Sequence, residues 1–354
     1  MTGIVRPDIR SMQTHPLKGM TMTATTSHIS KTSVNPMADL AAASGSAATA
    51  GNAAASAATT ADAASIHKAV IHVGDKPPRH WVGDGFPVHG MFDYGQGANQ
   101  RNPFLLMDYA APTSFTPNSG HRRGVGAHPH RGFETVTIVY DGEVEHRDST
   151  GAGGVIGAGD VQWMTAGNGI VHEEFHSEAF SQRGGTFEMV QLWVNLPAAK
   201  KNTAPAYQGI KAADIPVVQR DGGSVRIIAG ELDGIHGAAH THSELNVWEI
   251  DLAAGGSIRL PVPDTHNLLL VALRGETMVN DHDTLRASEL ATFTEDGGEI
   301  RLSAGAETSK LLLLSGVPID EPIAAYGPFV MNTREEILEK IHDFNAGKFG
   351  HLAA

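Results

Sequence analysis

The chain has 354 residues, of which 41% are hydrophobic and 18% are charged, so it can bury a sizeable core. No run approaches the roughly 18 consecutive apolar residues that a membrane span needs, and we therefore expect a soluble, cytoplasmic protein without membrane contact. The net charge is −13 with the histidines neutral. Because no basic stripe offsets this charge, direct binding of nucleic acid is disfavoured.

The sequence contains no cysteine and 19 histidines. The absence of thiols excludes disulfides, thiolate metal sites and cysteine nucleophiles, and it fits a reducing compartment. Any transition-metal site must therefore use imidazole and carboxylate ligands.

Residues 1–65 are expected to form a disordered leader. From Thr21 onward this segment is mainly Ala, Ser, Thr and Gly with few large apolar residues. Such a segment cannot bury enough surface to offset its conformational entropy. Met20, Met22 or Met37 could be the true start, and we assign the leader no part in folding.

From residue 66 onward, short β-type runs alternate with turns rich in Gly, Pro, Asn and Asp, which favours an all-β fold. A weak internal repeat is visible. YDGEVEHRD (140–148) precedes GAGDVQWMTAG (157–167), and LRGETMVND (273–281) precedes LRASELATFTEDG (285–297). The repeat predicts two tandem copies of one β-barrel.

The hinge between the two barrels is expected near residues 197–222. We assign residues 66–200 to a metal-binding first barrel and 201–320 to a second barrel without metal. The last segment, 321–354, is expected to pack back on the body and to hold one short helix. Asn332 or Thr333 can cap this helix, and its buried stripe is expected to comprise Ile337, Leu338, Ile341 and Phe344.

Two pairs of residues carry the chemistry. His128 and His130 lie two positions apart, so an extended strand turns both imidazoles to one face. His172 and Glu174 have the same spacing and follow a glycine-rich turn. Alone, each pair could be a solvated strand edge. Together they form a set of three histidines and one carboxylate, which suits a divalent first-row metal and leaves positions open for substrate.

Other polar residues leave alternatives open. Glu134 shares the face of His130 and is a rival carboxylate. Gln191 could line a pocket and bind substrate, or it could be an ordinary polar residue of a barrel. His146 and His176 are expected to be exposed. His240, His242 and Glu244 mimic the first pair, but no histidine follows them at the corresponding later position, so we expect surface histidines there.

Several long motifs resemble the pirin family of bicupins, over about Val82 to Phe344. They are DGFPV (84–88), NPFLLMDY (102–109), HPHRGFETVTIV (128–139), GDVQWMTAGNGIVHEE (159–174) and GPFVMNT (327–333). The resemblance implies two cupin barrels and one metal ion in the first, held by His128, His130, His172 and Glu174 rather than Glu134. It also implies an empty second cupin. Phe175 departs from the family, which often has Met at that position.

The resemblance further implies a quercetin 2,3-dioxygenase-type oxidoreductase that opens the ring of a flavonol with O2. In that reading Glu174 doubles as the general base. The metal is expected to be Fe2+, with Ni2+, Mn2+, Co2+, Cu2+ and Zn2+ as alternatives, because imidazole and carboxylate accept the whole first row. One alternative is a non-catalytic, iron-dependent regulator that contacts a metabolic enzyme or a transcription regulator. A third is a sugar-phosphate isomerase on the same scaffold.

Overall fold

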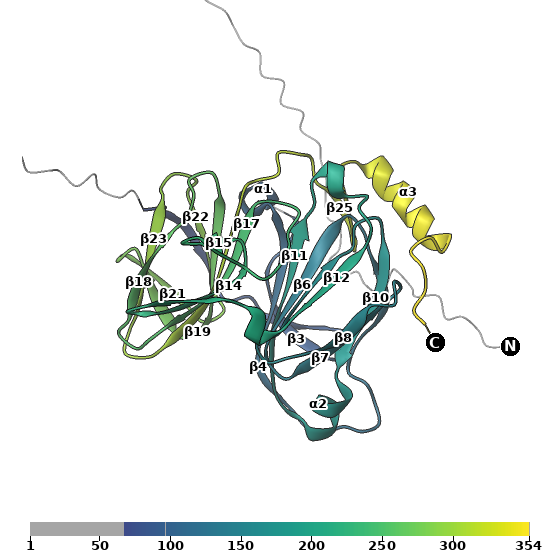
Figure 1. The fold of residues 1–354 in the computed structure, drawn as a ribbon, viewed down its shortest axis with the longest axis horizontal. Coiled ribbons are helices and arrows are strands. Elements are labelled where there is room, and N and C mark those ends of the chain that lie inside the picture. Colours follow the sequence, from purple (N-terminus) through teal and green to yellow (C-terminus); the bar gives the residue numbers. More distant parts are fainter. Residues whose placement is uncertain (1–66, 96, 354) are drawn as a thin grey trace, which may run out of the picture. The chain divides into compact units, whose positions relative to one another are not determined.

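The computed structural model describes residues 67–95 and 97–353, and the expected leader lies outside them. These residues are mostly β-strand and divide into two similar halves (Figure 1). Among the described helices, none is long and apolar enough to cross a membrane.

The first half contains a sheet of seven strands and a sheet of four. The larger has the order β12-β9-β6-β11-β4-β3-β2, with the bounds Arg79–Val82 (β2), Phe86–Phe92 (β3), Phe104–Phe115 (β4), Phe133–Asp141 (β6), Val161–Thr165 (β9), Gly185–Asn195 (β11) and Ala206–Ile210 (β12). The smaller has the order β5-β10-β7-β8, with the bounds Gly124–His130 (β5), Glu143–Asp148 (β7), Gly153–Gly157 (β8) and Ile170–His176 (β10).

The second half repeats this arrangement. Its seven-stranded sheet has the order β1-β22-β19-β24-β17-β14-β13, with the bounds Val70–Gly74 (β1), Val217–Arg220 (β13), Gly223–Ala229 (β14), Leu245–Leu252 (β17), Asn267–Arg274 (β19), Leu290–Phe293 (β22) and Ser309–Gly316 (β24). Its four-stranded sheet has the order β18-β23-β20-β21, with the bounds Ser257–Pro261 (β18), Glu276–Val279 (β20), Asp283–Arg286 (β21) and Glu299–Ala304 (β23).

The remaining elements are short. Two hairpins pair β15 with β16 and β25 with β26, and the helices are few; the bounds are Glu231–Leu232 (β15), Ile235–His236 (β16), Ala324–Tyr326 (β25), Phe329–Met331 (β26), Ala98–Arg101 (α1), Glu178–Arg183 (α2), Arg334–Asn345 (α3), Ala198–Lys200 (η2) and Ala212–Asp214 (η3).

The internal repeat seen in the sequence is present in the topology. Strands β7 and β20, which begin at the Glu of its two Gly-Glu pairs, occupy the same place in their sheets, and so do β9 and β22. The outermost strands are exchanged: β1 pairs with β22 of the second half, and β12 pairs with β9 of the first. Both pairings thus cross the boundary expected between residues 200 and 201. The boundaries of independently folding domains stay a prediction.

The strand pairing of the described residues joins the two sheets of neither half into a closed ring. What it shows is a pair of antiparallel sheets in each half, which is coarser than the expected closed barrels.

The largest apolar core lies between the two seven-stranded sheets. It combines residues of the first half, such as Val136 and Ile138, with residues of the second, such as Val271 and Leu312, all fully buried. A second cluster fills the second half, and a third fills the first half beside α2. The two halves therefore share one core as well as having their own.

Helix α3 begins with a capping box between Thr333 and Glu336, as a Thr-x-x-Glu sequence predicts. Ile337 is buried, and Ile341 and Phe344 pack beside it against the first half. Leu338 is 60% exposed, so its place in the expected buried stripe was wrong. It lies one residue, about 100° of helix rotation, from Ile337 and points away from the packed face.

Candidate metal centre

Neighbouring strands bring three histidines together. Strand β5 pairs with β10 so that His128 lies directly opposite His172, and His130 lies two residues further along β5. The imidazole centroids are 4.3 Å apart for His128 and His172, 4.7 Å for His130 and His172, and 4.8 Å for His128 and His130. One ring nitrogen from each lies within 4.8 Å of the others, which suits ligands of one ion.

The carboxylate of Glu174 belongs to an overlapping group. It lies with His146 and His172, again with one ligand atom of each within 4.8 Å of the others. Strand β10 pairs with β7 on its other side, and this pairing places His146 opposite Glu174. His172 is common to both groups, so all four residues expected as ligands meet around it.

Unpartnered nitrogens support a metal at this point. His172 Nε2 and His130 Nδ1 are buried and have no hydrogen-bond partner. Burial lowers the pKa of both rings well below the usual value, which keeps them neutral with a lone pair available. His128 Nδ1 lies 2.8 Å from the carbonyl oxygen of Gly126 and donates to it, which leaves Nε2 as the free lone pair. The residues present fit a divalent ion.

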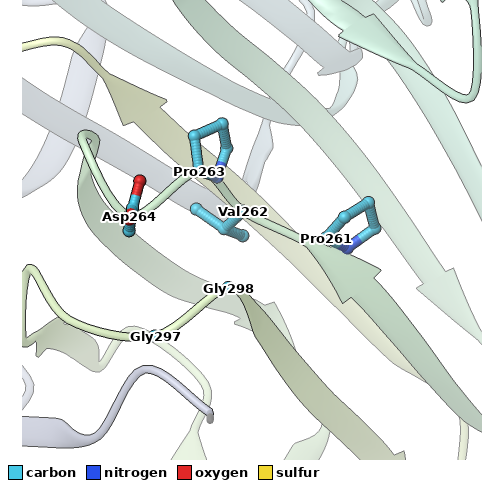
Figure 2. Close-up of a pocket in the computed structure, with 6 residues that line it drawn as sticks. All are labelled: Pro261, Val262, Pro263, Asp264, Gly297 and Gly298. Carbon is cyan, nitrogen blue, oxygen red and sulfur yellow. The ribbon is translucent and has the colours of Figure 1, made fainter. Parts of the chain in front are cut away.

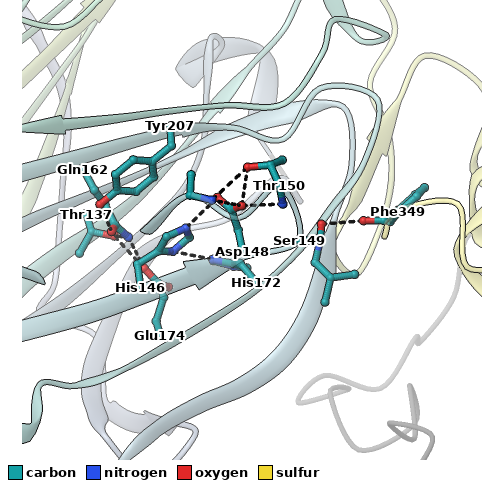
Figure 3. A network of polar contacts seen from close by, with 12 residues as sticks. Thr137, His146, Asp148, Ser149, Thr150, Gln162, His172, Glu174, Tyr207 and Phe349 are labelled. Carbon is teal, nitrogen blue, oxygen red and sulfur yellow. Dashed lines mark hydrogen bonds and ion pairs between the residues drawn. The ribbon is translucent and has the colours of Figure 1, made fainter. Parts of the chain in front are cut away.

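His146 was missed in the sequence. It is fully buried, not exposed as expected. Its Nε2 lies 3.2 Å from Asp148 Oδ2, and its Nδ1 lies 3.2 Å from His172 Nδ1 (Figure 3). If His146 donates to the carboxylate, its other nitrogen accepts the proton of His172 Nδ1, and His172 Nε2 is left as a lone pair. The pattern EVEHRD contained the signal, because Val144, His146 and Asp148 alternate with more exposed residues.

His176 is also buried, and its expected exposure was wrong as well. Its Nε2 donates to the carbonyl oxygen of Gly85 at 2.9 Å, and its ring packs among phenylalanines such as Phe187. Burial is the main cause that lowers its pKa to about 4. His176 is therefore a structural residue of the apolar core.

Glu174 is held through one oxygen. Its Oε1 accepts hydrogen bonds from Gln162 Nε2 and, at 3.2 Å, from Thr137 Oγ1 (Figure 3). Thr137 Oγ1 also lies 2.8 Å from Gln191 Oε1. The Thr137 hydroxyl group therefore links Gln191 to the carboxylate of Glu174. Gln191 and Thr137 lie on the same face of their sheet, and Gln191 is partly exposed. Among the described residues no donor contacts Oε2 of Glu174, which leaves that oxygen for a metal ion or a proton.

An aromatic wall adjoins the histidines. The ring of Trp193 lies 5.3 Å from that of His130, 4.3 Å from that of Phe133 and 6.2 Å from that of Tyr94. Trp193 is partly exposed, whereas its neighbours Leu192 and Val194 are fully buried. A flat apolar ligand could stack there.

Glu134 lies on the opposite face of β6 from Thr137. It shares that face with Val136 and Ile138, which pack against the second half. Its Oε1 accepts from Thr165 Oγ1 at 2.6 Å and lies 4.0 Å from His242 Nε2, while Oε2 has no partner. Burial raises its pKa to about 7. Glu134 is in neither ligand group, because four residues along the chain do not preserve one face where β5 ends and β6 begins.

The second half has no comparable group among its described residues. The counterparts of β5 and β10 are β18 and β23, which contain no histidine, and the interior between them is filled by apolar residues such as Leu260 and Leu302. An open depression of about 590 Å³ beside β18 has only Asp264 as an ionisable group; its lining is Pro261, Val262, Pro263, Asp264, Gly297 and Gly298 (Figure 2).

Known proteins match both halves of this chain. Family models match residues 85–194 (Pirin) and 247–350 (Pirin C-terminal cupin domain). A Pseudomonas aeruginosa protein named "Putative quercetin 2,3-dioxygenase" is 53% identical over 80% of this chain and 98% of its own length. A pirin-like protein of Caulobacter vibrioides is 40% identical over 75% of this chain and 90% of its own. The solved structure of an Acinetobacter baumannii quercetin 2,3-dioxygenase is 52% identical with a TM-score of 0.78, covering 80% of this chain and 99% of that one. The chain belongs to the pirin family.

Proposed function

We propose that this protein is a metal-dependent dioxygenase of the quercetinase type, which opens the ring of a flavonol with O2. The observation that carries the proposal is the convergence of three neutral imidazoles and Glu174 beside the partly exposed face of Trp193 and Gln191. Relatives named as quercetin 2,3-dioxygenases support it. Protein partners and a cytoplasmic location stay predictions.

His128, His130, His172 and Glu174 would hold one divalent ion, for which we propose Fe2+, with the other first-row ions as alternatives. When bound, such an ion supplies Lewis acidity that lowers the pKa of a flavonol hydroxyl. The side chains of the protein would accept the proton and position the substrate. Provided that its bond to the ion is labile, Glu174 can receive the hydroxyl proton at Oε2, because Gln162 and Thr137 hold Oε1. Gln191 would contact the substrate, and Trp193 would pack on its rings.

The test is oxygen uptake and loss of the quercetin absorption band by protein loaded with each ion in turn. We expect turnover that chelation abolishes, and Glu174→Ala should lower kcat by about 10²- to 10⁴-fold, the usual effect of removing a general base. The matched control is His242→Ala, which removes a histidine of the second half and should leave kcat unchanged.

Two results would overturn the proposal. Turnover by Glu174→Ala at the wild-type rate would show that Glu174 does not take part in the reaction. If no ion supports oxygen uptake, the regulatory or isomerase hypothesis is favoured. Metal analysis of protein purified without added metal tests the choice of Fe2+ separately.

A further inference from the structure

A row of polar side chains crosses the sheet that faces the candidate metal centre. Gln162 pairs with Thr137, Thr137 with Gln191, and Gln191 with Asp108, on the adjacent strands β9, β6, β11 and β4. Directly paired residues share one face of a sheet, so all four side chains project to the face on which Thr137 meets Glu174. We call these four residues the polar row.

The second half has the same sheet order but no metal-ligand group among its described residues, so it shows which side chains this row can contain without a metal centre. The corresponding cross-strand row there is Ala291, Leu270, Leu313 and Trp248, paired in the same order on β22, β19, β24 and β17. All four are buried in the apolar core of that half. Since the same fold tolerates a wholly apolar row, the polar row is not a requirement of the architecture.

Asp108, at the far end of the row, has no structural partner. It is partly exposed, and among the described residues its carboxyl group makes neither a hydrogen bond nor an ion pair. Burial, with a smaller effect of the negative charge of Asp93, raises its pKa to about 7. Holding an acid in such a position costs free energy, which is usual where a side chain serves a ligand.

The structure leaves space beside this carboxyl group. Gly90 pairs with Asp108 on the neighbouring strand β3, where the second half has Ile227 opposite Trp248. A Cβ atom at Gly90 would lie 3.5 Å from Asp108 Oδ1 and 3.4 Å from His80 Cε1. The glycine therefore leaves room for about one methyl group between the carboxyl group and the His80 ring.

We propose that Asp108 is the distal anchor of the substrate, which hydrogen-bonds a hydroxyl group at the end of an aromatic molecule whose other end lies at the metal centre. Asp108 lies two strands from Thr137, about 10 Å at the usual strand spacing. One ring cannot place two hydroxyls that far apart, whereas two or three linked rings can. The ligand class is therefore an elongated polyphenol, and this inference rests on the proposed function.

The experiment compares two flavonols, quercetin and 3-hydroxyflavone, which lacks the distal hydroxyls. Asp108→Asn should lower kcat/KM for quercetin by about 10-fold, mainly through KM, because the neutral amide oxygen accepts a weaker hydrogen bond than the carboxylate does. The value for 3-hydroxyflavone should change less than twofold. Asp93→Asn is the matched control, since it removes a nearby charge that is outside the polar row, and it should affect both flavonols little.

Gly90→Ala provides a second variant in case Asp108→Asn folds poorly. It narrows the space beside the carboxyl group without changing any charge, and it should also weaken quercetin more than 3-hydroxyflavone. Equal losses for both flavonols in both variants would show a merely structural role and overturn the inference.

Calorimetric binding separates this inference from the proposed function. If wild-type protein turns over neither flavonol but still binds quercetin more tightly than 3-hydroxyflavone, and Asp108→Asn removes the difference, the reaction is wrong and the anchor stands. If wild-type protein binds neither flavonol, both proposals fail.

Discussion

His172 owes its orientation to a neighbour that is not itself among the expected ligands. When His146 donates to Asp148, the series Asp148–His146–His172 fixes which nitrogen of His172 carries the proton, as outer partners of ligand histidines commonly do. The ring of His146 is in turn stacked on Tyr207 at 4.9 Å. The orientation of this proposed ligand therefore depends on two strands besides its own, β7 and β12.

Replacing His146 by Phe should lower metal affinity about 10- to 100-fold, because His172 loses the acceptor that orients it. The ring stacked on Tyr207 is kept, so the fold should persist. Competition with a chromophoric chelator measures the affinity. His176→Phe, at an equally buried histidine of the core, should bind metal like wild type. An unchanged affinity in His146→Phe would contradict the orienting role.

Glu134 should make the stability depend on pH. Its pKa in the fold, about 7, is raised above the usual 4.5, so folding must retain a proton that the unfolded chain releases. The free energy of unfolding should therefore fall as pH rises from about 4.5 to about 7, by on the order of 3 kcal/mol. Glu134→Gln should remove this loss and be the more stable variant at pH 8.

Denaturant titrations of chelator-treated protein at pH 5 and pH 8 measure the effect without a contribution from metal binding. Glu276→Gln, at an exposed position, controls for the loss of one negative charge. Equal pH dependence in wild type and Glu134→Gln would show that this carboxyl group is not the cause.

The pairs His128 and His130, and His172 and Glu174, could be found from the sequence because each lies on one strand, where spacing fixes the face. Although the spacing of Val144, His146 and Asp148 indicates that these three share one face, the roles of His146 and Asp108 could not be assigned in this way. Their importance depends on which strands lie side by side and in what register, and spacing along one chain does not contain that information. The expectation that Glu134 shares the face of His130 was wrong for the same reason, whereas the choice of Glu174 over Glu134 agrees with the ligand groups.

At the scale of elements, the sequence repeat located β7 with β20 and β9 with β22, because Gly-Glu turns and acidic turns leave local patterns. The exchange of β1 and β12 left no such trace. Each is an outer strand whose partner is not its neighbour in the sequence: β1 pairs with β22, and β12 pairs with β9. Contacts between distant segments therefore decide both pairings. The pattern of helix α3 predicted its cap but overestimated the width of its buried stripe at Leu338.

At the scale of the whole molecule, the shared core and the exchanged strands should make the two halves unfold together. Calorimetry should give one peak whose calorimetric and van't Hoff enthalpies agree. Leu314→Ala, in the shared core, should cost about 2–5 kcal/mol and shift that peak without splitting it. Two separate transitions would show that the halves are independent.

The exchange of β12 also ties the chemistry to the chain that follows the first half. Tyr207, on this borrowed strand, reaches Gln162 Oε1 at 3.4 Å and covers the ring of His146. A fragment cut at residue 200 would keep every proposed ligand but lose Tyr207, which contacts Gln162 and His146. Strand β9 would also lose its partner β12, and such an unpaired edge strand is prone to aggregation. We therefore expect that the half with the proposed metal centre cannot be excised by cutting at residue 200.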